Sequence, residues 1–249
     1  YFFNNYKKGD GFRDNSQYES ENFYSFLSYK ITNNINISCE FTYLDYLAQQ
    51  PGGLTDQMFY DDIFQSNRQR NWFQVKWFLY NLKFSYDINE FTNLSLNAFS
   101  LNASRYAIGF RTNRVDQIDS FEERDLITTD FENIGIETKL IYRNNFFKYN
   151  STLLVGNKLF KGHNSSKQGP GSNGVEPNFT YQYNLYPNYE DQSDYSNPNR
   201  NISFFAENII QFNDKTALIP GFRFEYIETK SNGYYRNINT DAAGNVILN

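Results

Sequence analysis

Apolar and polar residues alternate along most of this chain with a period of two. The clearest segment spans residues 35–48. One set of side chains there is apolar, namely Ile35, Ile37, Cys39, Phe41 and Tyr43, and the intervening set is polar, namely Asn36, Ser38, Glu40 and Thr42. Successive side chains of a β-strand point to opposite faces, so the pattern predicts a strand with one apolar and one polar face.

The segment before it has the same pattern and predicts a hairpin. Phe23, Leu27, Tyr29 and Ile31 share one face of the segment 23–31. The residues between the two segments, Thr-Asn-Asn at 32–34, are typical of a tight turn. If Ile31 pairs with Ile35, both apolar faces stay on the same side of the sheet, which is the condition for a stable antiparallel register.

This unit recurs, and we expect about nine strands that pair in sequence order in one antiparallel sheet. The expected strands lie near 18–31, 35–48, 72–88, 94–107, 131–144, 150–163, 200–212 and 217–231. They are longer than the roughly 5 to 6 residues of ordinary strands and match the roughly 9 to 11 residues that cross a bilayer.

The connections alternate in length, which decides between a membrane barrel and a soluble β-sandwich. Short turns are expected at 32–34, 89–93, 144–150 and 214–216, and long polar connections at 9–17, 48–71, 108–131, 163–200 and 231–249. Short periplasmic turns and longer extracellular loops are typical of outer-membrane barrels. The pattern therefore predicts an all-β fold, an antiparallel transmembrane β-barrel.

Composition agrees with a barrel and excludes several classes of function. The mean hydropathy is −0.70 although 19% of the residues are aromatic, and no stretch approaches the roughly 18 apolar residues of a spanning helix. The net charge of −5 argues against nucleic-acid binding. Cys39 and His163 are single residues of their kind, and no nucleophile–base pair or phosphate loop occurs. We therefore expect no enzyme, no cofactor and no resident metal.

The polar faces carry charged residues that would line a hydrated lumen. These are Glu40, Lys83, Glu137, Lys139, Arg143, Glu207, Arg223 and Glu225. If Asn213 lies opposite Ala217, Glu207 lies directly across from Arg223. The simplest interpretation is that these charges neutralise one another on a wet wall, and the alternative is a role in transport or in contact with a plug.

Four short motifs, in their order along the chain, carry a resemblance to a known family. They are Gly-Asp-Gly-Phe-Arg-Asp-Asn at 9–15, Gln-Pro-Gly-Gly-Leu-Thr-Asp at 50–56, Phe-Ala-Glu-Asn at 205–208 and Pro-Gly-Phe-Arg-Phe-Glu at 220–225. In these motifs the chain resembles TonB-dependent outer-membrane receptors, most of all the ferric-citrate receptor branch. The resemblance implies a barrel of about 22 strands whose lumen holds an N-terminal plug.

The resemblance also implies a setting and a cargo. Residues 1–249 would be part of one barrel domain, with the plug and the remaining strands outside them. The receptor would take up a ferric chelate, such as ferric citrate or a similar siderophore, driven by a TonB-type partner that acts through the plug. Outer-membrane lipid and lipopolysaccharide would surround it in a Gram-negative bacterium, and surface accessory proteins could join it. The abundance of Asn, Tyr, Lys, Phe and Ile resembles Bacteroidetes proteins.

Six arginines near expected strand ends are candidate ligands of such a cargo, because guanidinium groups bind carboxylates in a bidentate manner. They are Arg68, Arg70, Arg105, Arg111, Arg114 and Arg200. Arg200 would lie at the return from the longest loop. Alternatively, these arginines pair with loop acids such as Glu122, Glu123 and Asp125, or with lipopolysaccharide.

Two other functions remain open from the sequence. The cargo could be a different siderophore or an oligosaccharide, which aromatic residues around the outer vestibule would favour. The barrel could also be a surface protein that does not transport and serves in adhesion or assembly. A plug and a TonB-contact segment in the same polypeptide would distinguish transport from that role.

Overall fold

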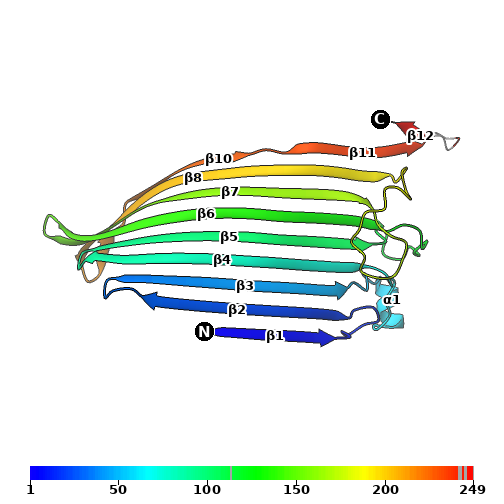
Figure 1. Ribbon diagram of the computed structural model, residues 1–249, viewed down its shortest axis with the longest axis horizontal. Helices are drawn as coiled ribbons and strands as arrows, with labels where there is room; N and C mark the ends of the chain where they lie inside the picture. Colours follow the sequence, from blue (N-terminus) through cyan, green and yellow to red (C-terminus); the bar gives the residue numbers. More distant parts are fainter. Residues whose placement is uncertain (113, 241–242, 244–245, 249) are drawn as a thin grey trace.

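The computed structural model describes residues 1–112, 114–240, 243 and 246–248, and its strands form one antiparallel sheet (Figure 1). The strands are β1 Phe2–Gly9, β2 Tyr18–Lys30, β3 Ile35–Gln49, β4 Trp72–Asn89, β5 Thr92–Gly109, β6 Asp125–Phe146, β7 Tyr149–Pro170, β8 Asp191–Asn213, β9 Thr216–Leu218, β10 Gly221–Thr229, β11 Asn232–Thr240 and β12 Val246–Leu248. A short helix, α1 Asp56–Asp61, lies in the loop before β4. Within the described residues, no helix has the length and apolar character needed to cross a membrane.

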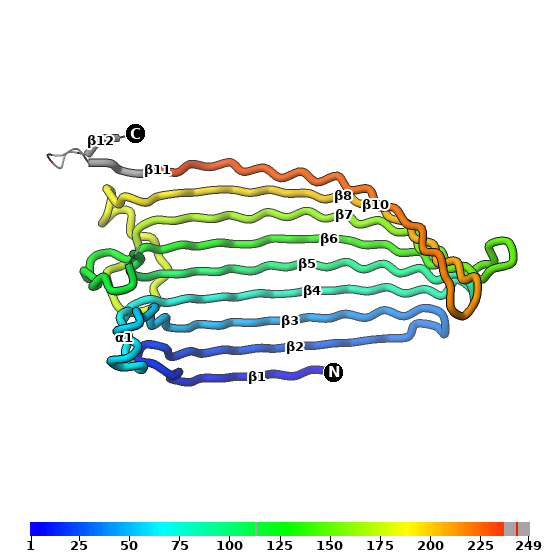
Figure 2. The backbone as a smooth tube through the Cα atoms, turned by 180° about the vertical axis from the view of Figure 1, so that it is seen from behind, coloured from blue at the N-terminus to red at the C-terminus, as the bar shows by residue number. Residues whose placement is uncertain are grey.

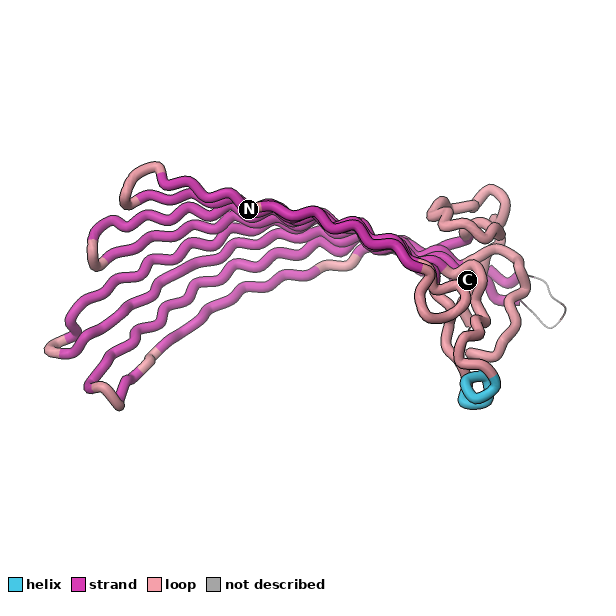
Figure 3. The backbone as a smooth tube through the Cα atoms, turned by 90° about the horizontal axis from the view of Figure 1, so that it is seen from below, coloured by secondary structure: helices cyan, strands magenta, loops and turns pink. Residues whose placement is uncertain are grey.

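The order of strands in the sheet follows the sequence from β1 to β8, as predicted. The segments β9, β10 and β11 all pair with β8, so they are successive parts of one long, interrupted strand beside it. The sheet therefore has about nine long strands side by side. It is a single layer (Figure 3). The described strands leave it open, since the order begins at β1 and ends at β11 and β12 without a return to β1.

The first predicted hairpin is confirmed in its register. The N–H of Ile31 donates to the carbonyl of Ile35 at 2.9 Å, and Lys30 pairs with Asn36. All short turns lie at one end of the sheet and all long loops at the other (Figure 2). We call these the turn end and the loop end.

Three strands are much longer than predicted. β6 and β7 each have 22 residues and β8 has 23, so the loops expected at 108–131 and 163–200 shrink to 110–124 and 171–190. Polar stretches made these strand ends resemble loops, yet Ser165 pairs with Asp130 and Ser166 with Thr129. The connection expected at 231–249 was also wrong in part, because Asn232–Thr240 forms β11 and pairs with β8.

One predicted register was also wrong. Gln211, not Asn213, lies opposite Ala217. The turn holds two residues instead of three, with Asn213 opposite Thr216, and an irregularity at Gln211/Asn213 displaces the pairing by one residue more, so that the total shift is two residues. Glu207 therefore lies opposite Gly221, and Arg223 lies opposite Phe205. Instead of meeting Glu207, the Arg223 guanidinium donates to Glu225 at 2.5 Å. A shift of two residues leaves every side chain on its predicted face.

The register confirms that the predicted charged residues share one face, which we call the polar face. Lys83, Glu137 and Glu225 lie in a single row that crosses the sheet. Glu137 and Lys139 form an ion pair on this face at 2.5 Å. The opposite or apolar face carries large exposed side chains near the turn end, among them Leu82, Ile134 and Phe204. Such a broad exposed apolar surface indicates contact with lipid.

The two faces exchange character part-way toward the loop end. On the apolar face, Tyr43 is followed by Asp45, which forms an ion pair with Lys76 at 2.9 Å. At the same level along the strands, the polar face carries pairs of hydrophobic residues, such as Leu44 with Trp77 and Leu79 with Leu101. The apolar band spans about eight residues per strand, or roughly 26 Å along the strand, which is close to the height of a lipid-facing band. The strands therefore continue beyond this band at the loop end.

Candidate functional site

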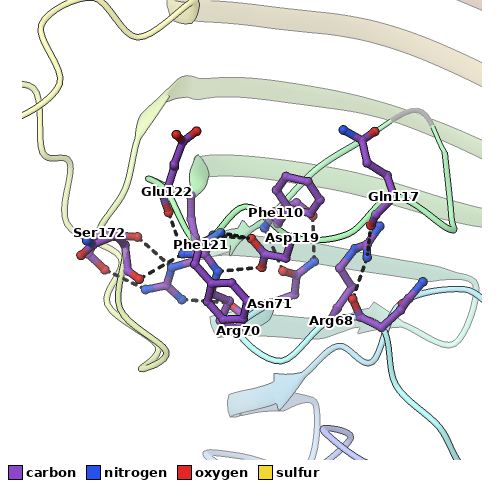
Figure 4. A network of polar contacts seen from close by, with 12 residues as sticks. Arg68, Arg70, Asn71, Phe110, Gln117, Asp119, Phe121, Glu122 and Ser172 are labelled. Atoms are coloured by element: carbon purple, nitrogen blue, oxygen red, sulfur yellow. Dashed lines mark hydrogen bonds and ion pairs between the residues drawn. The ribbon is translucent and has the colours of Figure 1, made fainter.

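Three buried arginines hold the long loops together at the loop end. Arg70 and Arg124 are fully buried, and only 6% of the surface of Arg68 is exposed. They come from different connections, since Arg68 and Arg70 precede β4 and Arg124 precedes β6. Figure 4 shows Arg68 and Arg70 pointing into the loop 110–124.

Arg70 uses its whole guanidinium group within the protein. Its Nε and Nη2 donate to the two carboxylate oxygens of Asp119 at 2.7 and 2.5 Å. Its Nη1 donates to the carbonyls of Glu122 at 2.6 Å and Asn173 at 3.0 Å. The ring of Phe121 lies 5.1 Å from the guanidinium carbon. A bidentate pair that is buried in this way fixes two loops against each other.

Arg124 binds backbone carbonyls from two other segments. Its Nε donates to the Ser172 carbonyl at 2.9 Å, and its Nη1 to the Arg70 carbonyl at 2.8 Å. Its Nη2 donates to the Ser172 hydroxyl at 2.7 Å and the Glu176 carbonyl at 2.9 Å. Burial, followed by the nearby charge of Arg70, lowers the pKa of Arg124 to about 10. Nothing in the sequence pattern singled out Arg124.

Arg68 completes this cluster, which we call the arginine clamp. Its Nη1 donates to the carbonyls of Asn67 at 2.6 Å and Gln117 at 3.1 Å. Its Nη2 donates to the Val115 carbonyl at 3.3 Å, and the Phe110 ring lies 5.2 Å away. The structure thus brings Arg68 and Arg70 together, but both guanidinium groups are already occupied by protein oxygens.

Asp119 is the acidic member of the clamp. Its burial alone would raise the pKa, but the hydrogen bonds from Arg70 and from the Phe121 N–H prevail and lower it. The carboxylate therefore stays ionised at neutral pH and neutralises one of the buried cations.

The other four predicted arginines lie apart from the clamp. Arg111 forms an ion pair with Asp125 at 2.5 Å, which is one of the alternatives that the sequence left open, and Arg114 pairs with Asp116 at 2.8 Å. Arg105 lies on the polar face within β5, opposite Val75 and Thr129. Among the described residues, the Arg105 guanidinium has no hydrogen-bond or ion-pair partner.

The expected position of Arg200 is wrong. It lies within β8, on the apolar face and opposite Glu228, with which it forms an ion pair at 2.5 Å. The longest loop ends earlier than expected, because β8 already begins at Asp191. Arg200 is therefore several residues away from any loop and on the face opposite to Arg105.

The polar face near Arg105 is lined by aromatic and apolar side chains. Trp77 lies opposite Ala103 and Phe131 on successive strands, one row from Arg105. The Trp77 Nε1–H is buried and has no acceptor in the described part of the chain. Two donors without acceptors, this N–H and the Arg105 guanidinium, thus belong to neighbouring rows of the polar face.

An asparagine-rich patch follows toward the turn end. It borders a cavity of about 450 Å³ lined by Asn197, Asn199 and Asn201 together with Lys158 and Arg223. The buried Oδ1 atom of Asn201 finds no donor within the described residues. The sequence pattern does not identify this patch, because loops also contain isolated Asn residues.

No family model matches the sequence, and no curated protein matches it. Several solved structures share its fold, and three of them are ferric-chelate transporters or receptors. The unliganded ferric citrate transporter FecA matches 95% of this chain with a TM-score of 0.79 and 16% identity. BauA, the ferric preacinetobactin receptor from Acinetobacter baumannii, matches 93% with a TM-score of 0.67 and 10% identity.

The third is the ferric-catecholate import receptor Fiu from E. coli K12 in an open form, which matches 98% of this chain with a TM-score of 0.65 and 9% identity. The chain shares the fold of part of the β-barrel of these proteins. The chain spans 34%, 38% and 42% of the lengths of FecA, BauA and Fiu. This barrel fold matches the prediction made from alternating residues and connection lengths, and the low identities assign no cargo.

Proposed function

We propose that this chain forms part of the wall of an outer-membrane receptor that imports a ferric chelate, with a citrate-type chelate favoured. The shared fold of three ferric-chelate transporters and receptors supports this class of function. The motifs at 9–15 and 50–56 support the citrate type. Energy would come from a TonB-type partner that acts through a plug.

The observation that carries the proposal is the pair of free donors on the polar face. Within the part of the chain that the structure describes, the Arg105 guanidinium and the Trp77 Nε1–H have no acceptors, while the arginines of the clamp are occupied. Citrate carboxylates are anionic acceptors, which suit such donors. Apolar neighbours such as Phe131 exclude water and strengthen each hydrogen bond. We therefore place the cargo against β4 and β5 on the polar face, below the loops.

This placement revises the set of predicted ligands. Arg105 is the principal candidate, and Arg111 could reach the cargo only by leaving Asp125. Arg68 and Arg70 would act indirectly, by holding the loop 110–124 above the cargo. Arg200 lies on the other face and is left out.

The proposal is tested by ferric-citrate binding to the full-length receptor. Loss of one charge-assisted hydrogen bond, about 1.5–3 kcal/mol, should make Arg105→Ala bind about 10- to 100-fold more weakly. Trp77→Phe, which removes only the N–H donor and keeps an aromatic ring, should bind several-fold more weakly. Arg223→Ala is the control, because its guanidinium is paired with Glu225 away from this region. Equal affinity in the parent and all three variants would remove Arg105 from the cargo site.

The aromatic lining supports a second candidate cargo, a neutral chelate or an oligosaccharide. Aromatic and apolar side chains such as Tyr46, Trp77 and Phe131 occupy the polar face near the loop end. Arg105→Ala and one further variant, Trp77→Ala, separate the two cargoes. An oligosaccharide should lose affinity when Trp77 is changed to Ala and should be indifferent to Arg105→Ala, whereas an anionic chelate should show the reverse order of effects.

A further inference from the structure

A cleft at the loop end lies between the connection 10–17, residues 64–69 and the loop 171–190. Its volume of about 800 Å³ is within the range of small-ligand sites. Trp72 belongs to its lining and is only 8% exposed. The Nε1–H of Trp72 donates to the Val175 carbonyl at 2.7 Å, which fixes this part of the cleft.

The cleft opens on the outside of the wall and not toward the lumen. Gln49 and Trp72, which both line it, lie opposite each other, and the alternation along β3 and β4 puts them on the same side of the sheet as the apolar band. Gln49 is roughly 20 Å beyond Tyr43 toward the loop end, so the cleft lies past this band. The sheet separates it from Arg105 on the polar face.

The motifs at 9–15 and 50–56 meet beside this cleft and set its shape. Arg13 joins them, because its Nη1 donates to the Gly52 carbonyl at 2.8 Å. Its Nε and Nη2 donate to the Gln65 carbonyl at 3.0 and 2.8 Å. All three guanidinium nitrogens are therefore bound to backbone oxygens, so the loops are held together and Arg13 is not available to an anionic ligand.

Four polar side chains of the lining have no hydrogen-bond or ion-pair partner among the described residues. They are Asp10, Asp14, Gln17 and Gln69. A glutamine amide both donates and accepts hydrogen bonds, whereas a carboxylate only accepts them. Arg13 is the one cation among the described residues of the lining, and its donors are taken. The cleft therefore suits a ligand with hydroxyl groups and disfavours an anion.

Two aromatic rings stand beside these free polar groups. Phe12 and Phe64 both line the cleft, with ring centroids 5.0 Å apart, and remain 69% and 52% exposed. A sugar ring presents C–H groups on its faces and hydroxyl groups around its edge. Aromatic faces next to amides and carboxylates match both parts of a sugar, whereas a lysine side chain would use the carboxylates and leave the amide donors unpaired.

We propose that this cleft binds a short, neutral oligosaccharide outside the barrel wall. Sugar hydroxyls donate to the carboxylates of Asp10 and Asp14. Others exchange hydrogen bonds with the amides of Gln17 and Gln69, and a C–H face lies against Phe64. The carboxylates repel acidic sugars. Because the cleft and the polar face lie on opposite sides of the sheet, this site is separate from the cargo region and does not depend on which cargo is imported.

The experiment measures binding of the purified full-length receptor in detergent to an array of neutral and acidic oligosaccharides. The parent should bind neutral glycans in preference to acidic ones. Gln17→Ala/Gln69→Ala removes two sets of hydrogen bonds and should weaken that binding about tenfold or more. Gln117→Ala is the matched control, an exposed glutamine of the loop 110–124, and should bind within about twofold of the parent. Ferric-citrate affinity should be unchanged in both variants, which shows that the receptor is intact.

Three outcomes would overturn the proposal. The first is that the parent retains no neutral glycan, or that the double glutamine variant binds as well as the parent. The second is a loss of glycan binding in Trp77→Ala and not in the double glutamine variant, which would place the sugar in the lumen as a cargo. The third is capture of a lysine-rich peptide in place of glycans, abolished by Asp10→Asn/Asp14→Asn, which would indicate a basic partner. Loss of ferric-citrate binding alone would count only against the proposed cargo.

Discussion

Buried and exposed arginines of this protein have the same chemistry and different uses. Arg70 and Arg124 are fully buried, and every guanidinium nitrogen that they present is bound to a protein oxygen. Arg105 lies exposed on the polar face and has no partner among the residues that the structure describes, and Arg114 pairs with a neighbouring acid in solvent. Residue type alone therefore does not identify a cargo ligand.

The comparison shows what decides the role of an arginine here. The clamp residues lie where loops from different parts of the chain converge, and carbonyl groups from the loops 110–124 and 171–190 converge on them. Arg105 lies on a strand, where the neighbouring backbone is already paired within the sheet. A guanidinium group beside unpaired loop carbonyls donates its hydrogen bonds to them. A guanidinium group beside strands whose backbone is already paired keeps its donors available for a ligand.

The largest expected effect is the loss of the clamp. Arg70→Ala leaves the carboxylate of Asp119, 7% exposed, without its partner, and breaking such a buried pair costs about 3–5 kcal/mol. We expect the loop 110–124 to open locally while the strands persist, because the ladder of the sheet does not involve this side chain. Hydrogen exchange in that loop should be more than a hundredfold faster.

Two variants sharpen this prediction. Arg70→Lys keeps the charge but cannot form the bidentate pair, so its exchange rate should fall between those of the parent and Arg70→Ala. Asp119→Asn should open the same loop from the acidic side of the pair. Unchanged exchange in Arg70→Ala would mean that the loop is held by its other contacts and that the clamp is dispensable.

A smaller effect is expected from acidification. The pKa of Asp119 in the folded protein lies below its ordinary value of 3.8, so its stabilising contribution is complete above that value. It is lost as the pH falls through the lowered pKa, because the protonated carboxyl no longer neutralises Arg70. Pepsin cleavage within 110–124 should therefore accelerate only below about pH 4.

Asp119→Asn is the control for this titration, since it lacks the ionisable group. Its cleavage in the loop should be fast already at the upper end of the pH range that pepsin tolerates, with little further change on acidification. A parent-like pH profile in Asp119→Asn would show that the transition does not arise from Asp119.

Much of the fold followed from the sequence because a strand's alternation is local. The Ile31–Ile35 hairpin and the shared face of Lys83, Glu137 and Glu225 depend only on a period of two. The full lengths of β6 and β7 did not follow, since polar pairs such as Ser166 with Thr129 occur beyond the apolar band and interrupt the alternation of apolar and polar residues. The shift at Gln211 was likewise invisible, because a bulge preserves the alternation on either side of it.

The candidate site followed less well, because its contacts join distant loops. Arg70 reaches Asp119 and Asn173, and Arg124 reaches Ser172 and Glu176, across separations that no local pattern encodes. The sequence could suggest that arginines matter at the loop end. It could not show that Arg68 would donate its hydrogen bonds to loop carbonyls while Arg105 would have no partner among the described residues, since burial depends on how the loops assemble.

The smallest effect is expected for an exposed arginine, Arg114. Arg114 and Asp116 form an ion pair at 2.8 Å, with 75% and 49% of their side chains exposed. Water and salt screen such a pair, and each side chain loses conformational freedom on forming it. Arg114→Ala should therefore leave hydrogen exchange in 110–124 indistinguishable from that of the parent, measured beside Arg70→Ala under one set of conditions. Faster exchange in Arg114→Ala than in Arg70→Ala would break the comparison, because it would mean that the exposed pair, and not the buried clamp, holds this loop.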